Sequence, residues 1–241
     1  MGALRYQDLW RRRRRRRRRR RWRWRCAGPQ SRQSVADASR AVTVASIGGV
    51  SPAEEADAAP AERERLVLAA RQLAEAEGWA AVTHRRLAER TGIDIEALYR
   101  RFPDPAALMS AVAVLGFADL AAALAAARDT ATGGERGQWP AVVMAYLDFA
   151  YASPEVYDAM LTHTADLTLG RDPGPGAPRA ASAELRAALT PLAAGRDPDT
   201  LAEVGWALLH GTVMLTRGGR LRPDVQEQRE EMIMSGIFAA P

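Results

Sequence analysis

Apolar side chains begin to recur at helical spacing near residue 61, and the residues before that point show no core-forming pattern. Leu66, Ala69 and Leu73 fall on one helical face and predict an amphipathic helix over Ala61–Glu77. Gly78 ends this helix, because glycine commonly follows the last helical turn. The folded part of the chain is therefore expected to begin at about residue 61.

Two short helices with recognisable start and stop signals follow. Thr83 is an N-cap residue for a helix over His84–Thr91, which Gly92 breaks. Asp94 caps a second helix over Ile95–Phe102, and a proline ends it. Two helices of about two turns joined by a glycine-containing turn are typical of a helix-turn-helix. Its inner face is expected to consist of Leu87, Ala88, Ile93, Leu98 and Phe102.

The rest of the chain is also helical in pattern. A long Ala/Leu-rich helix is predicted over Asp104–Arg128, and Gly133–Gly137 and Leu169–Pro178 are expected to be loops. Further helices are predicted at Gln138–Ala152, Pro154–Thr164, Pro178–Ala194, Pro198–Thr216 and Pro223–Ala239.

No strand pattern occurs, so the predicted fold class is all-α, with a three-helix helix-turn-helix head joined by a long helix to an all-helical C-terminal domain. The predicted divisions are a disordered Arg-rich tail over 1–60, the helix-turn-helix domain over 61–121 and the helical C-terminal domain over 122–241.

Composition excludes several kinds of chemistry. All 34 basic residues other than histidine are Arg, so a Schiff-base, phosphate-loop or kinase-type lysine is impossible. The single cysteine, Cys26, excludes an internal disulfide and a multi-cysteine zinc site. We find no nucleophile elbow, dinucleotide fingerprint or zinc motif, and we predict no enzyme activity, metal or cofactor. No apolar run approaches the roughly 18–20 residues of a membrane span, so a soluble protein is expected.

The net charge of +5 conceals two regions of opposite sign. Residues 1–50 hold 16 Arg and two acids, whereas the remaining residues are acidic overall. The unbroken run Arg11–Arg21 is expected to be disordered. Three interpretations remain open: a basic arm that binds nucleic acid, a targeting peptide, or upstream GC-rich sequence before a true start at Val42, Val44 or Val50.

The segment Glu75–Leu108 resembles the DNA-binding domain of the tetracycline-repressor (TetR/AcrR) family of bacterial regulators. The resemblance extends over about Ala61–Leu120, and it departs from the family at Pro105, where a Lys is usual. The matching features, without a gap, are Gly78-Trp79, Thr83, Leu87-Ala88, Gly92-Ile93, Leu98-Tyr99, Phe102 and Ala107-Leu108.

The resemblance implies which residues face DNA. Arg85, Arg100 and Arg101 can bind phosphates or guanine edges, and Tyr99 can donate to a phosphate. Glu96 either accepts from cytosine N4 or forms an i,i+4 pair with Arg100. The implied DNA-binding residues are Thr83, His84, Arg85, Ile95, Glu96, Ala97, Tyr99, Arg100 and Arg101.

The C-terminal part resembles the effector domain of one TetR subgroup, through Tyr146–Ala150, Ser153–Tyr157 and the signature of Trp206, His210 and Gly211. Aromatic and thioether side chains there suit an apolar ligand, although for any single one of them ordinary core packing is the more common role. The predicted ligand pocket comprises Trp139, Met144, Tyr146, Tyr157, Met160, His163 and Trp206. The predicted dimer interface comprises Leu201, Val204, Leu208, Leu215, Val225, Ile233 and Ile237.

These features predict a homodimeric, sequence-specific transcriptional regulator of the bacterial cytoplasm. We expect a repressor that a small, mostly apolar ligand releases from its double-stranded DNA operator. The alternative is a non-specific nucleic-acid-binding protein in which the Arg-rich tail supplies the affinity.

Overall fold

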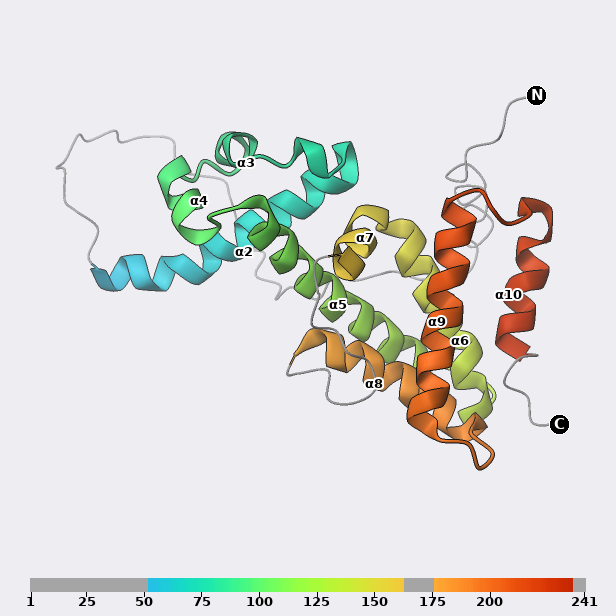
Figure 1. The fold of residues 1–241 in the computed structure, drawn as a ribbon. Helices are drawn as coiled ribbons and strands as arrows, with labels where there is room; N and C mark the ends of the chain where they lie inside the picture. The colour runs from blue at the N-terminus through green and yellow to red at the C-terminus, as the bar shows by residue number, and fades with distance from the viewer. Residues whose placement is uncertain (1–51, 163–175, 236–241) are drawn as a thin grey trace, which may run out of the picture. The chain divides into compact units, whose positions relative to one another are not determined.

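The computed structural model describes residues 52–162 and 176–235, and all regular elements in these two stretches are helical. Residues from Ala58 onward form one compact unit. The elements are α2 (Pro52–Glu77), η1 (Trp79–Ala81), α3 (His84–Thr91), α4 (Ile95–Arg101), α5 (Pro105–Asp129), α6 (Glu135–Ala152), α7 (Pro154–Thr162), α8 (Ala177–Leu189), η2 (Thr190–Leu192), α9 (Pro198–Arg217), η3 (Pro223–Val225) and α10 (Gln226–Ser235) (Figure 1). The all-α prediction is confirmed.

The first described helix is longer than predicted. It begins at Pro52 rather than at residue 61 and continues through Pro60, so residues 52–60 are helical and not part of an irregular tail. Pro52 lies in the first turn, where a proline is tolerated, and the alanines and glutamates that follow it have high helix propensity, which explains this earlier start. The Arg-rich residues 1–51 lie outside the described residues.

The next long helix, α5, runs from the head into the C-terminal half of the chain (Figure 1). Contrary to the sequence-based expectation, its length and mean hydropathy satisfy the criteria for a membrane span, and it is the one such helix in the described ranges. Half of its most apolar window is buried inside the protein, where α5 packs against α6, α7 and α8. Its apolar composition is therefore that of a core helix.

A glycine permits the close contact between α5 and α7. A Cβ atom at Gly116 would lie 2.5 Å from Val156 Cγ1 and 2.8 Å from Met160 Sδ, so a larger side chain at this position would push α7 away from α5. This close approach makes the position of α7 depend directly on that of α5.

Prolines and glycines set several boundaries differently from the prediction. The predicted loop Gly133–Gly137 ends early, because α6 already begins at Glu135. The α8 helix ends at Leu189 and continues as the 3-10 turn Thr190–Leu192, since Pro191 has no N–H to extend the α-helical ladder. The last predicted helix is divided into Pro223–Val225 and Gln226–Ser235, and its predicted end at Ala239 lies outside the described residues.

Candidate nucleic-acid interface and effector site

The helix-turn-helix is built from local capping signals. The Thr83 hydroxyl accepts from the backbone N–H of Arg86 at 3.3 Å, at the start of α3. Gly92 ends α3 with a φ of +70°, a left-handed conformation that glycine adopts without strain. The Asp94 carboxylate then accepts from the N–H of Glu96 at 2.8 Å and begins α4. These contacts confirm the predicted caps and fix the turn between the two helices.

Apolar side chains on the inner face hold this motif together. Leu87, Ile93, Leu98 and Phe102 are buried as predicted, and Ala88 is half-buried. Ala97 also lies in this core, with 8% of its surface exposed, so its side chain is not available to DNA. The assignment of Ala97 to the DNA-facing set is therefore corrected, because the side chain points toward the inner face of α4.

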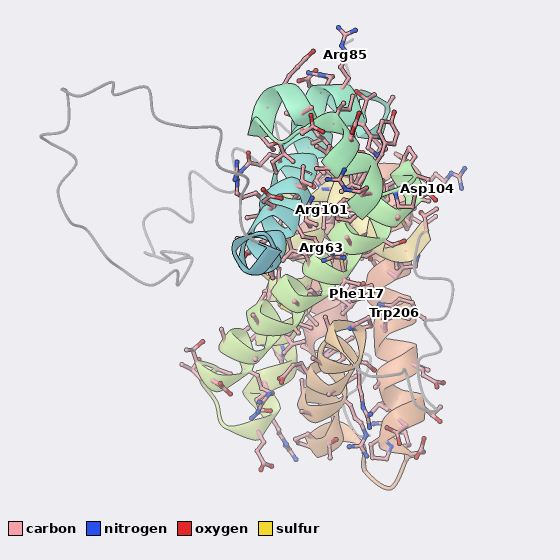
Figure 2. All side chains as sticks on the ribbon, turned by 90° about the vertical axis from the view of Figure 1, so that its left-hand side faces the viewer. Arg63, Arg85, Arg101, Asp104, Phe117 and Trp206 are labelled. Atoms are coloured by element: carbon pink, nitrogen blue, oxygen red, sulfur yellow. The ribbon has the colours of Figure 1, made fainter. Side chains whose placement is uncertain are left out.

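The outer face of α4 is exposed and chemically mixed. Tyr99 is 53% exposed and Ile95 is 40% exposed, and Glu96 and Arg100 are exposed as well. Among the described residues, Glu96 and Arg100 form no ion pair with each other or with other side chains. Both charges therefore remain available for a partner. On α3, Arg85 extends away from the head (Figure 2) and pairs with Glu89 through an exposed contact of 3.1 Å.

Arg101, although adjacent to Arg100, has a different position. Its guanidinium forms an ion pair with Glu62 of α2 and also donates to the carbonyl of Ala97 at 3.4 Å. The guanidinium of Arg63, also on α2, lies over the Phe102 ring, 5.3 Å from its centroid. Arg101 therefore connects the end of α4 to α2, which corrects its assignment as a free DNA contact.

His84 is half-buried at the first position of α3 and faces the end of α4. Its Nε2–H donates to the carbonyl of Phe102 at 2.7 Å. Its ring stacks on Tyr99 with centroids 4.1 Å apart and an interplanar angle of 15°. At the start of α5, Asp104 caps the helix by accepting from the N–H of Ala107 at 2.7 Å, beside the proline that replaces the family's usual lysine.

The second candidate site lies in the C-terminal half, where α6, α7 and α9 meet. The hydroxyls of Tyr146 and Tyr157 are 2.8 Å apart, and the Tyr157 hydroxyl is 2.9 Å from Nδ1 of His210. Trp206 stacks on the His210 ring one turn along α9, with centroids 5.8 Å apart. The structure therefore brings together three predicted pocket residues and adds His210, whose i,i+4 spacing from Trp206 was the available sequence signal.

Burial favours the uncharged forms of the groups in this cluster. It raises the pKa of Tyr146 and of Tyr157 above the ordinary value for a phenol. It lowers the pKa of His210 below that of a free imidazole, although Asp158 opposes the shift. The cluster can therefore offer hydrogen bonds to a ligand without offering a charge.

The other predicted pocket residues have different surroundings. Trp139 is fully buried, and its indole N–H donates to the carbonyl of Ile233 at 2.9 Å, so it connects α6 to α10. Met160 is buried against Gly116 of α5, and Met144 is half-buried on α6. His163 lies outside the described residues.

Among the described residues, polar contacts from α2 and η1 of the head reach α7 and α5. The Glu75 carboxylate accepts from the backbone N–H of Val156 at 2.9 Å, and the indole N–H of Trp79 donates to the carbonyl of Glu155 at 3.0 Å. An ion pair joins Arg71 to Asp119 of α5. Burial raises the pKa of Glu75, although its bond with Val156 opposes the shift. Sequence analysis missed these contacts because no local pattern marks them.

The predicted dimer residues divide into buried and exposed groups. Leu201 and Ile233 are buried in the core of the chain itself, which corrects their assignment to an interface. Val204 is 50% exposed and Leu215 is also exposed, whereas Leu208 and Val225 are half-buried. Ile237 lies outside the described residues. The structure adds Met214 on α9 and Met232 on α10 to the exposed apolar surface.

The braced helix-turn-helix with an exposed outer face, attached to a helical domain, defines a DNA-binding regulator. Comparison with known families agrees. The model described as "Bacterial regulatory proteins, tetR family" matches residues 66–112, and the model described as "Tetracyclin repressor-like, C-terminal domain" matches residues 139–237. The chain belongs to the TetR family of bacterial regulatory proteins. It is thus a DNA-binding transcriptional regulator and not an enzyme.

Solved structures with the same fold come from several bacteria. A protein of unknown function from Rhodococcus sp. RHA1 is 28% identical, with a TM-score of 0.56 over 72% of this chain and 94% of that one. A putative transcriptional regulator from Pseudomonas aeruginosa PAO1 is 20% identical, with a TM-score of 0.51 over 74% and 91% of the two chains. A TetR regulator from Legionella pneumophila is 18% identical, with a TM-score of 0.50 over 71% and 94%. Comparison with curated proteins gives no match.

Proposed function

We propose that the chain is a homodimeric repressor of the bacterial cytoplasm that a small, mostly apolar ligand releases from its operator. The supporting observation is that α7, a helix of nine residues, contributes to both the ligand site and the contact with the head. Tyr157 belongs to the polar cluster of the candidate ligand site. Val156 and Glu155 bond to Glu75 and Trp79 of the head.

This arrangement gives a direct route from ligand to DNA. A helix moves as a unit, so a ligand that displaces Tyr157 also displaces the neighbouring Val156 and weakens its bond with Glu75. The orientation of the head then changes relative to the two half-sites of an operator. A coupling of about 1–3 kcal/mol, or a 5–150-fold loss of DNA affinity, is enough for regulation.

The chemistry of the site favours an uncharged ligand. The phenols of Tyr146 and Tyr157 and the imidazole of His210 are neutral at neutral pH, so they cannot compensate the cost of burying a charge. They can exchange hydrogen bonds with a hydroxyl or carbonyl group, and the Trp206 ring offers a flat apolar surface. We therefore propose a ligand with a large apolar part and one or two polar groups.

The exposed apolar side chains of α9 and α10 are the proposed dimer surface. Val204, Met214, Leu215 and Met232 are large apolar residues with at least 40% of their surface exposed. A second copy of the chain that packs its α9 and α10 against the same helices would cover them. A dimer would also present two heads to two half-sites, which a specific operator requires.

The ligand-coupling proposal is tested with operator DNA selected by the protein from a random duplex library. Ligands found by thermal-shift screening are titrated into the free dimer and into the DNA-bound dimer by calorimetry. We expect weaker ligand binding to the DNA-bound form, because the coupling is reciprocal. Glu75→Ala should reduce this difference, whereas the control Glu77→Ala should not, since Glu77 pairs with Arg86 within the head. Equal ligand affinity for both forms contradicts the proposal.

The dimer proposal is tested by two matched valine substitutions. Val204→Glu places a charge on the proposed surface and should produce monomers with greatly reduced operator affinity in sedimentation and anisotropy experiments. Val114→Glu is the control, because Val114 is 51% exposed and lies on α5, away from the proposed surface. If both variants stay dimeric, the interface lies elsewhere.

A further inference from the structure

His84 begins α3, yet its side chain makes its described contacts at the other end of the motif, with α4. The preceding residue, Thr83, is the N-cap, and its hydroxyl accepts from the N–H of Arg86. The start of α3 is therefore capped without the side chain of His84. Half-buried between the two helices, His84 is less accessible to a DNA phosphate than the neighbouring Arg85, which extends into solvent (Figure 2).

The hydrogen bond of His84 compensates for the end of the recognition helix. The N–H of Phe102 still bonds to the carbonyl of Leu98, but Pro103 follows, and the α-helix ends at Arg101. The Phe102 carbonyl therefore lacks a helical donor, and Nε2 of His84 lies 2.7 Å from it. Because a carbonyl only accepts, the proton must lie on Nε2, and this bond fixes the orientation of the imidazole ring.

The fixed ring then restrains Tyr99. The two rings are nearly parallel and 4.1 Å apart, so His84 covers one face of the Tyr99 ring. Tyr99 is nevertheless 53% exposed, because its other face remains open to solvent. A two-turn helix has little stability of its own, so the direction of Tyr99 depends on such tertiary contacts.

We propose that His84 is a positioning residue for operator recognition: it holds the Tyr99 ring in its DNA-binding orientation and does not itself contact DNA. The inference rests on the proposed interface, in which Tyr99 contacts the operator. A side chain that is ordered before binding loses less rotamer entropy on binding. We therefore expect loss of the His84 ring to weaken operator binding by about 3- to 10-fold through Tyr99.

A double-mutant cycle separates positioning from direct contact. The full chain, His84→Ala, Tyr99→Ala and the double variant are titrated by anisotropy against a duplex that the wild-type chain selects from a random library. His84→Ala should weaken binding in the wild-type background but change it by less than about twofold in the Tyr99→Ala background, since coupled neighbours are not additive. Full additivity of the two effects overturns the inference and leaves the interface intact. No effect of Tyr99→Ala overturns both.

A conservative variant separates positioning from a purely structural role. His84→Gln keeps an N–H donor for the Phe102 carbonyl but has no ring to stack on Tyr99. It should restore the melting temperature that His84→Ala loses while its operator affinity stays low. Recovery of both quantities by His84→Gln would show that the residue acts only as a cap for α4 and would overturn the inference.

Discussion

The head and the effector region differ in where their functional polar side chains lie: those of the head are exposed, and those of the effector region are mostly buried. In the head, the residues proposed to bind DNA, such as Tyr99 and Arg100, are exposed on one short helix. In the effector region, Tyr146, Tyr157 and His210 form a mostly buried chain contributed by three helices. A polyanion binds from outside, whereas a small apolar ligand must be enclosed. Substitutions of exposed residues on the outer face of the head should therefore change DNA binding without changing stability, whereas substitutions in the buried effector cluster should change stability as well.

The largest expected effect tests the core on which the exposed face of the head depends. Leu98 is fully buried, and Leu98→Ala should destabilise the head by about 2–5 kcal/mol through lost burial and a residual cavity. Ile95→Ala, on the same helix but 40% exposed, is the control and should change stability little. Denaturant unfolding of both variants measures the difference, and equal losses of stability contradict the assigned faces of α4.

Two adjacent arginines provide a second test of the head. Arg100→Gln should weaken operator binding by about 1–3 kcal/mol, because Arg100 is exposed and unpaired in the described structure. Arg101→Gln should chiefly lower the melting temperature, because it removes the ion pair with Glu62. Anisotropy and thermal melts on both variants decide between these roles. If Arg101→Gln has the larger effect on DNA affinity at unchanged stability, the two assignments are reversed.

The same substitution in the two regions sharpens the comparison. Tyr157→Phe removes a buried hydroxyl that bonds to both Tyr146 and His210, and should cost about 1–3 kcal/mol of folding stability. Tyr99→Phe removes a hydroxyl from an exposed ring and should leave stability almost unchanged while weakening operator binding. Calorimetric melting of the two variants measures their loss of stability. If Tyr157→Phe loses less stability than Tyr99→Phe, the Tyr157 hydroxyl is not buried in solution.

The stability of the effector region should depend on pH through His210. Its pKa is lowered in the folded chain, so the unfolded chain binds protons first as the pH falls below about 6.5. The contribution of this group is therefore present above that pH and is lost as the pH falls toward the lowered pKa of the folded state. The melting temperature of the wild-type chain should decrease over this interval, and His210→Gln should have a flatter profile. A steeper profile for the variant contradicts the assignment.

The smallest effect on specific binding is expected from removal of residues 1–50. The composition changes abruptly after this Arg-rich stretch, so the shortened chain should select the same operator as the full chain. Non-specific DNA affinity should fall and depend less steeply on salt if the stretch acts as a basic arm. Competition anisotropy at two salt concentrations measures both quantities. Loss of sequence preference would instead favour the alternative in which the tail supplies the binding.

Local sequence signals determined much of the head. The N-caps Thr83 and Asp94 and the break at Gly92 are interactions between residues within three or four positions of one another, so their patterns predict them. The periodicity of Leu87, Leu98 and similar residues predicted the buried face for the same reason. The family resemblance then followed from the spacing of these signals.

Only the tertiary structure decided which polar side chains bond to other parts of the protein and which remain available to a partner. Arg101 and Arg100 are indistinguishable in the sequence, but the ion pair with Glu62 depends on how α2 packs against α4. The bond from Val156 to Glu75 and that from Tyr157 to His210 likewise join residues far apart in the chain. Such contacts depend on the relative positions of the helices, and many weak packing interactions determine these positions together. A short sequence pattern therefore cannot predict the contacts.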